Sequence, residues 1–246
     1  LERGQTVVST CEELAWPWMR HPELSEQLHN TARRNGGRLL GTGVNPGFLM
    51  DVFPLVVSRV CRRIDRVKVY RIQDASDRRI PFQKKIGAGL SHDEFDRRVH
   101  TGALRHVGLA ESMHFLAHYL NLEIDSWCEI LTPVEDPSGV ITGVRQVGRA
   151  MRGEECIIEL YFEAGIGIET PHDRVVIEGD RPVDVVWKGG VHGDVGTSSV
   201  TLGSIQPLMA SSAGLHTMAT IPVSAQGLRI RRSGLSTAPP PRRPQG

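Results

Sequence analysis

The 246-residue sequence has no complete phosphate-binding motif. It contains neither the dinucleotide fingerprint G-x-G-x-x-G nor the P-loop pattern G-x-x-x-x-G-K-[ST]. The nearest match to the dinucleotide fingerprint is "GTGVNPGF". Its glycines lie at 41, 43 and 47, so the spacing between the second and third glycines is one residue too wide. The G-x-S-x-G elbow and the H-E-x-x-H zinc pattern are missing as well. These absences argue against a P-loop nucleotide hydrolase, an elbow-type serine hydrolase and a zinc protease of that class.

Long apolar runs, charge excess and paired cysteines are also missing. No run approaches the roughly 20 apolar residues of a membrane-spanning helix, so we expect no membrane role. A net charge of +1 gives no general attraction to nucleic acid. The four cysteines form no C-x-x-C pair, which predicts reduced core thiols in a cytoplasmic protein. The remaining composition, 39% hydrophobic and 23% charged, is that of a globular chain.

The first sixty residues alternate between strand-like and helix-like patterns. "TVVST" is a β-branched run, and an amphipathic helix over 21–37 stops at a glycine pair. A second strand precedes a helix over 48–62, which Pro54 should kink because proline lacks an N–H. This alternation predicts the parallel sheet of an α/β unit.

The rest of the chain predicts a mostly β sheet covered by helices. A half-buried strand over 66–75 is followed by helices at 91–99 and 107–120. Past Asp125 strands dominate, with "VEDPSGVITG" as a loop between them, and a helix over 196–212 closes the fold. The Pro- and Arg-rich segment 222–246 is expected to be a disordered tail.

Three patterns allow a functional and a structural interpretation. Glu111, His114 and His118 have metal-ligand spacing on one helix, but they fall opposite an apolar stripe, so we expect a solvated face and no metal. Cys11 follows a strand, where an activated thiol is conceivable, yet no neighbouring base is evident. The turn "GTGVNPGF" would either face a ligand with its N–H groups or simply pack tightly.

Polar residues at strand ends and helix starts are candidates for a substrate pocket. An amino-acid or diamine substrate needs a carboxylate for its ammonium group and a base that takes a proton, for which a histidine is suited near neutral pH. We expect the base to be one of two histidines or, failing both, a lysine. The alternative for each histidine is a purely structural role. The candidates are His106, His192 and Lys84 as catalytic groups, and Asp74, Gln83 and Asp194 as substrate-binding groups.

Taken in order, "STCEEL", "GTGVNPGF.MD", "RHVGL.ES", "TGV.Q", "PHDR..I.G" and "GGVHGD" resemble the 2,4-diaminopentanoate dehydrogenase family, relatives of dihydrodipicolinate reductase. The resemblance runs from about Val7 to about Ile221. It implies an NAD(P)-dependent oxidoreductase, an α/β Rossmann domain followed by an α+β domain, and a homo-oligomer. The domains expected from it are a Rossmann remnant over 1–46 and a substrate-binding and oligomerisation domain over 47–221.

The resemblance also implies a nicotinamide pocket. The crossover between domains would supply Asn45, Pro46, Gly47 and Phe48, and the loop after the preceding strand would supply Thr10 and Cys11. The glycine-fingerprint half is missing, so we expect roughly 80–110 residues of a nucleotide-binding part before Leu1.

The expected function is that of a truncated dehydrogenase of amino acids of the diamino-acid type. The segment "YRIQDASDRRIPFQKK" lacks the histidines of dihydrodipicolinate reductases, so an amine or amino acid is the preferred substrate. The alternative is a non-catalytic binding or scaffold protein that kept the fold. A metal-dependent hydrolase using His114 and His118 ranks last.

Overall fold

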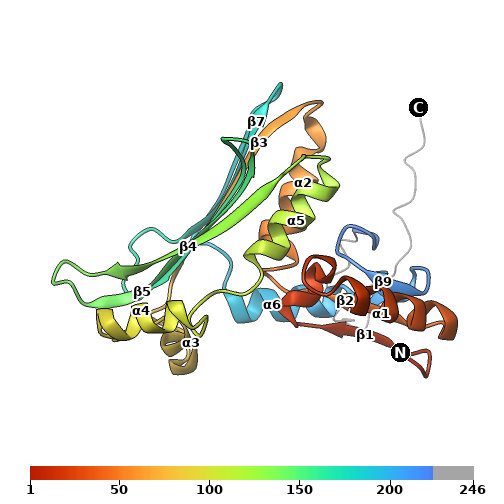
Figure 1. Cartoon of the computed structure of the whole chain (residues 1–246), viewed down its shortest axis with the longest axis horizontal. Coiled ribbons are helices and arrows are strands. Elements are labelled where there is room, and N and C mark those ends of the chain that lie inside the picture. Colours follow the sequence, from red (N-terminus) through yellow and green to blue (C-terminus); the bar gives the residue numbers. More distant parts are fainter. Residues whose placement is uncertain (224–246) are drawn as a thin grey trace, which may run out of the picture.

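The chain forms two β-sheets, each covered by helices (Figure 1). The computed structural model describes residues 1–223. A three-stranded sheet has the order β1-β2-β9, and a six-stranded sheet has the order β4-β5-β6-β3-β7-β8. The predicted combination of a parallel α/β unit and a mixed sheet covered by helices is confirmed. The tail predicted over 222–246 lies almost entirely outside the described residues.

The small sheet is parallel throughout. β1 (Thr6–Ser9) is followed by two short 3₁₀ turns, η1 (Glu12–Ala15) and η2 (Pro17–Met19), and then by helix α1 (Pro22–Asn35) and β2 (Arg38–Gly41). The helix ends at Gly36, whose φ of 72° lies in the left-handed region that glycine accepts most readily. The predicted strand–helix–strand unit is therefore confirmed.

The third strand of the small sheet comes from the far end of the described chain. β9 (Gly214–His216) pairs with β2 in parallel register, with Leu39 opposite Leu215. Leu40, Leu208 and Ile221 form a separate apolar cluster beneath this sheet. The division of the chain at residues 46 and 221 stays a prediction. β9 belongs to the small sheet, whereas the following Ala219 packs against the core of the large sheet.

The helix predicted over 48–62 is broken into three pieces. A π-helical turn η3 (Phe48–Val52) leads into α2 (Phe53–Val57), which is followed by a 3₁₀ turn η4 (Ser58–Val60). Pro54 stands at the start of α2, where its missing N–H removes the hydrogen bond that would join the two pieces. The kink expected at Pro54 is therefore a change from a π-helical turn to an α-helix.

The large sheet contains one parallel pair among antiparallel neighbours. Its strands are β3 (Ile64–Asp74), β4 (Ser126–Glu135), β5 (Ile141–Arg152), β6 (Glu155–Gly165), β7 (His172–Gly179) and β8 (Val183–Lys188). β3 runs parallel to β6, with Val69 opposite Leu160 and Arg71 opposite Phe162. The loop predicted over 134–143 is shorter than expected, because the antiparallel pairing of β4 with β5 continues to Glu135 and Ile141.

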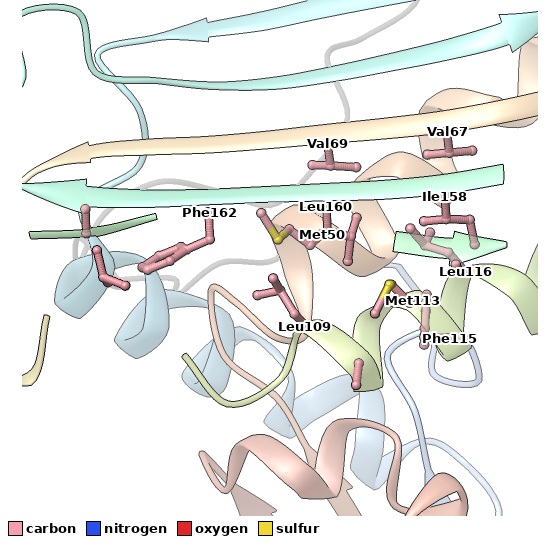
Figure 2. Packing of buried hydrophobic residues seen from close by; sticks show 14 of the residues in the cluster. Met50, Val67, Val69, Leu109, Met113, Phe115, Leu116, Ile158, Leu160 and Phe162 are labelled. Carbon is pink, nitrogen blue, oxygen red and sulfur yellow. The ribbon is translucent and has the colours of Figure 1, made fainter. Parts of the chain in front are cut away.

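Helix α5 (Leu109–Tyr119) covers the inner face of the large sheet. Figure 2 shows Leu109, Met113 and Leu116 facing the valines and the branched side chains of β3 and β6. Figure 1 places α5 on the side of the sheet that faces the small sheet. The apolar stripe predicted for this helix is confirmed, and it is the main core of the molecule.

The other helices surround the end of the large sheet. They are α3 (Ile80–Lys85), α4 (His92–His100), α6 (Gly193–Gly203) and α7 (Ile205–Met209). The helix predicted over 196–212 is two helices, because Pro207 cannot donate a hydrogen bond to the preceding turn at Gly203. α6 and α7 carry the chain from β8 back to β9 in the small sheet.

The four cysteines carry free thiols but are not core residues. Cys11 and Cys128 are exposed, and Cys61 and Cys156 are half-buried, so the expectation of core thiols is wrong. In residues 1–223, no helix combines the length and the apolar character needed to cross a lipid bilayer.

Candidate functional site

Two adjoining cavities lie between the small sheet, the large sheet and α6. The central cavity has a volume of about 340 Å³, and the crossover cavity has a volume of about 450 Å³. Five residues line both cavities: Glu12, Asn45, Arg79, Asp194 and Thr197. The two cavities therefore form one continuous candidate site, walled by the loop after β1, the crossover after β2, the α3 region and the first turns of α6.

The central cavity carries more positive than negative charge. Its basic residues come from β3, from the turn before α3 and from α3 itself, and its two acids come from the loop after β1 and from α6. The cations are Arg71, Arg78, Arg79 and Lys85, and the anions are Glu12 and Asp194. A surplus of cations beside a few carboxylates suits a ligand that carries both a carboxylate and an ammonium group.

The cation on β3 is already neutralised by a buried partner. Arg71 Nη1 donates to Asp173 Oδ1 at 2.9 Å, and its Nη2 donates to the Val191 carbonyl at 3.1 Å. The other oxygen of Asp173 accepts from the Val191 N–H at 2.7 Å, and Gln73 Nε2 donates to the same carbonyl as Arg71. Burial raises the pKa of Asp173, against the opposing pull of Arg71. This network fixes the loop that leads into α6.

Glu12 is an acid at the junction of the two cavities. Its Oε1 lies 3.6 Å from Lys85 Nζ, and both side chains line the central cavity. Burial raises the pKa of Glu12, although Lys85 pulls it back. A carboxylate whose pKa moves upward toward neutrality is a better proton acceptor than an ordinary surface glutamate.

His106 forms the floor of the central cavity. Its ring stacks on Phe162 with the centroids 4.5 Å apart, and the Asn45 amide donates to its Nε2 at 3.0 Å. Gln146 holds the backbone on both sides, accepting from the His106 N–H and donating to its carbonyl. Burial, with the positive charges of Lys85 and Arg71, lowers the pKa of His106 to about 3. The imidazole is therefore neutral, and this low pKa makes it a weak base.

The crossover loop is held by a buried acid. Gly47, with a φ of 123°, donates its N–H to Asp51 Oδ2, and an added Cβ there would lie 2.6 Å from the Gly43 nitrogen. The oxygens Thr42 Oγ1 and Asn45 Oδ1 are buried and have no hydrogen-bond partner within residues 1–223. Since buried polar atoms normally have partners, these two oxygens are candidates for ligand contacts.

The structure brings about half of the predicted site residues together. Asn45, His106 and Asp194 line the central cavity, and Thr10 and Pro46 line the crossover cavity with Asn45 and Asp194. Their roles as catalytic, cofactor-binding and substrate-binding residues stay predictions. Their common location supports the idea that the turn "GTGVNPGF" faces a ligand.

The substrate-pocket candidates at the end of β3 and within α3 line neither cavity, and two of them have structural contacts instead. Asp74 Oδ1 accepts from the Ser76 N–H and the Gly167 N–H, which closes a loop. Gln83 Nε2 donates to the Ala75 carbonyl at 2.9 Å. Lys84 lines neither cavity, whereas the next residue, Lys85, does.

The remaining candidates also lie outside the two cavities. His192 caps α6, where its Nδ1 accepts from the Val195 N–H at 3.4 Å. Cys11 is exposed, and its backbone N–H donates to Ser9 Oγ. Gly47 is buried within the crossover, and Phe48 stacks on Phe53 beside a separate apolar groove. For these residues, too, the predicted roles stay untested.

Several residues of the site were not among the predicted ones, although the sequence carries a signal for some of them. Arg71 and Gln73 continue the inward-facing positions of Val67 and Val69, and a charged residue at such a position needs a buried partner or a ligand. Glu12 directly follows β1, at the strand end where α/β sheets bind ligands. For Arg78 and Lys85 no signal separates them from the neighbouring basic residues.

The helix face with metal-ligand spacing is not uniformly solvated. His118 is exposed, but His114 is half-buried and hydrogen-bonds the Ala110 carbonyl through Nδ1. Glu111 is almost fully buried and accepts from Arg20 Nε at 2.8 Å, so its expected exposure is wrong. The reason is that the 3₁₀ turns after β1 pack on this side of α5. Among residues 1–223 no group of three or more histidine, cysteine and acidic side chains is arranged to hold a metal.

Comparison with known proteins relates this geometry to a family. Residues 48–232 match the family model described as the 2,4-diaminopentanoate dehydrogenase C-terminal domain. The 2,4-diaminopentanoate dehydrogenase of Acetoanaerobium sticklandii is 30% identical over 241 residues, which cover 91% of this chain and 68% of the relative. A solved structure of an amine dehydrogenase from Mycobacterium smegmatis has the same fold, with a TM-score of 0.73 and 22% identity over 90% of this chain and 70% of the other. The family expected from the ordered motifs is thereby confirmed, and the chain belongs to the 2,4-diaminopentanoate dehydrogenase C-terminal domain family.

Proposed function

We propose that this chain is the substrate-binding part of a nicotinamide-dependent oxidoreductase that acts on the amino group of an amino acid of the diamino-acid type. One observation carries the proposal: the central cavity joins an acid of raised pKa to a cluster of cations, directly beside the crossover loop. The relative from Acetoanaerobium sticklandii, named for such a substrate, supports this choice.

The residues of the crossover cavity fit the nicotinamide end of NAD(P). Asn45 Oδ1 and Thr42 Oγ1 are buried acceptors without partners among the described residues, and the carboxamide of a nicotinamide offers N–H donors. Thr10, Pro46 and Ser198 line the same space. When bound, the nicotinamide would accept the hydride from the carbon that carries the amino group. The sequence has no glycine fingerprint, so the proposed contacts are limited to the nicotinamide end of the cofactor.

Glu12 would bind the substrate ammonium and take a proton from it. Burial raises the pKa of Glu12, which favours proton uptake, and its place at the junction of the cavities lets it contact both ligands. Lys85, at 3.6 Å, would keep enough negative charge on Glu12 for it to attract the ammonium.

His106 would position Asn45 rather than transfer protons. With a pKa of about 3 its imidazole stays neutral, and its Nε2 accepts the Asn45 amide hydrogen. This hydrogen bond leaves Asn45 Oδ1 directed to other donors. His192 and Lys84 remain candidates for proton transfer only if the loop before α6 or helix α3 moves toward the cavity.

Two further expectations stay proposals of the same kind. The homo-oligomer expected from the resemblance would be checked by light scattering after gel filtration. The choice between NAD and NADP would be checked by comparing turnover with the two cofactors.

The proposed function is tested by changing Glu12→Gln and following nicotinamide reduction with 2,4-diaminopentanoate. We expect kcat/KM to fall by roughly 100-fold or more, which is typical for the loss of a general base. Glu13→Gln is the matched control, since Glu13 is the next residue and lines neither cavity. If the unmodified protein neither binds the diamino acid nor reduces the nicotinamide in its presence, the proposed function is wrong and the scaffold alternative gains support.

A further inference from the structure

The guanidinium group of Arg78 is held in a narrow slot at the edge of the central cavity. Its Cζ lies 4.1 Å from the centroid of the Phe82 ring, and only 7% of the side chain is exposed. Gly193 lies beside the same group, where an added Cβ would lie 2.7 Å from Arg78 Nη1. A side chain at residue 193 would therefore force the end of Arg78 to shift, so the glycine lets the guanidinium take this position.

The hydrogen-bonding edge of Arg78 is only half used. Its Nη2 donates to Asp194 Oδ1 at 3.2 Å, whereas its Nε is buried and has no acceptor in the part of the chain that the structure describes. Nε and Nη2 point along the same edge, which is the edge that binds a carboxylate with two parallel hydrogen bonds. An arginine so placed would gain a second, charge-assisted hydrogen bond from a better-placed carboxylate.

Asp194 is a loosely held occupant of this edge. Its side chain is 46% exposed, it lies on the first turn of α6, and it lines both cavities. Arg79 Nη2 approaches the same Oδ1 at 3.6 Å, so two arginines converge on one oxygen. Asp194 thus meets the buried guanidinium through one half-exposed oxygen at 3.2 Å, and a ligand carboxylate that binds both Nε and Nη2 would replace it.

We propose that Arg78, assisted by Arg79, is the binding site for the substrate carboxylate, and that Asp194 occupies this site until the substrate displaces it. The inference rests on the proposed function and adds the residues that bind the substrate carboxylate. The site would select amino acids over amines of the same carbon chain, because an amine offers nothing that replaces Asp194 on the arginine.

The geometry also defines the orientation of the ligand. The carboxylate would lie against Arg78 at the α3 side of the central cavity, and the ammonium would lie against Glu12, which lines the same cavity from the loop after β1. The reacting carbon would then lie near Asn45, where the two cavities meet.

The test measures calorimetric binding of 2,4-diaminopentanoate and of 1,3-diaminobutane, the diamine that lacks only its carboxylate. Asp194→Asn removes the competing charge, so we expect several-fold tighter binding of the diamino acid and unchanged binding of the diamine. Asp77→Asn is the control, because it removes the same charge from an exposed position next to Arg78. The control distinguishes displacement of Asp194 by the ligand from a general change in the electric field at Arg78.

Two variants test the arginine itself. Arg78→Lys keeps the charge but loses the two-pronged edge, and we expect the diamino acid to bind at least 10-fold more weakly. Gly193→Ala places a methyl group in the slot without changing any charge and should weaken the same ligand selectively. Circular dichroism and melting curves verify that each variant is folded, and if Arg78→Lys does not fold, Asp194→Asn and Gly193→Ala decide.

Three outcomes would overturn the inference. The first is equal affinity of the unmodified protein for both ligands, with no change of the affinity ratio in Asp194→Asn. This result would rule out the carboxylate site but would still agree with an oxidoreductase that acts on amines. Weaker diamino-acid binding in Asp194→Asn would show that Asp194 holds the ligand and is not displaced by it. Failure of the unmodified protein to bind either ligand would remove the proposed function as well.

Discussion

Asp51 is enclosed in the core next to the crossover loop, and its environment disfavours the charged form. Burial raises the pKa of this carboxyl to about 6, against the lowering effect of the Gly47 N–H, while nearby Glu111 adds to the increase. Asp51 therefore accepts a proton more readily in the folded chain than in the unfolded chain, where the pKa is near 3.8. A difference of about two pKa units corresponds to roughly 3 kcal/mol.

We expect the stability of the protein relative to Asp51→Asn to rise as the pH falls. Above the folded pKa of about 6 the buried charge carries its full cost, and between that value and 3.8 the folded state binds the proton first. Lowering the pH from 7 to 4 should thus raise the unfolding free energy of the unmodified protein, relative to that of Asp51→Asn, by up to roughly 3 kcal/mol. Chemical denaturation at each pH measures it.

The control for this prediction is Asp96→Asn, which changes an exposed aspartate on α4. Its stability difference from the unmodified protein should stay flat over the same pH range. A flat profile for Asp51→Asn as well would mean that the carboxyl is not buried in solution as the structure has it.

At the scale of secondary-structure elements, α5 contributes the largest share of side chains facing the inner side of the large sheet. Leu116 is fully buried between this helix and the sheet. Leu116→Ala should lower the free energy of unfolding by about 2–5 kcal/mol, because the change both removes buried apolar surface and leaves a cavity. Equilibrium unfolding in urea measures the change.

Leu24→Ala is the matched control, since Leu24 is also a helical leucine but is 50% exposed. We expect it to change stability by less than about 0.5 kcal/mol. Equal losses in the two variants would contradict the assignment of α5 as the core helix.

Elements with strong periodicity were predictable, and elements decided by contacts far along the chain were not. The stripe on α5 and the alternation along β3 and β6 follow from the positions of their apolar residues. β9 has only three residues, and nothing local marks it as a strand until β2 pairs with it. The exposure of Glu111 was misjudged for the same reason, because its partner Arg20 is 91 residues away.

The candidate site was only partly predictable, because its residues meet through strand register. Arg71 lies opposite Phe162 on the parallel pair β3 and β6, and this register places the arginine beside the His106 ring that stacks on Phe162. Sequence motifs identified Asn45, His106 and Asp194 as polar residues near turns. They gave no means of choosing Lys85 over Lys84, since the choice depends on how the short helix α3 is rotated.

At the scale of the whole molecule, we expect this chain to bind NADPH weakly. The crossover cavity offers contacts to the nicotinamide end, whereas most dinucleotide affinity comes from a glycine-rich phosphate site that the sequence lacks. Fluorescence titration should give NADPH and reduced nicotinamide mononucleotide similar affinities, within about 10-fold. A low-micromolar dissociation constant for NADPH, far below that of the mononucleotide, would contradict this expectation.

The pairing of β9 with β2 has a consequence for how the protein is made. During synthesis β1 and β2 leave the ribosome early, but the outer edge of β2 stays without its partner until residues 214–216 have been translated. For that whole interval the large sheet can assemble while the small sheet offers open hydrogen-bonding groups to other chains. Nascent chains that end before residue 214 should therefore bind chaperones. Chains that extend through residue 216 should be released from the chaperones, because β9 can then pair with β2.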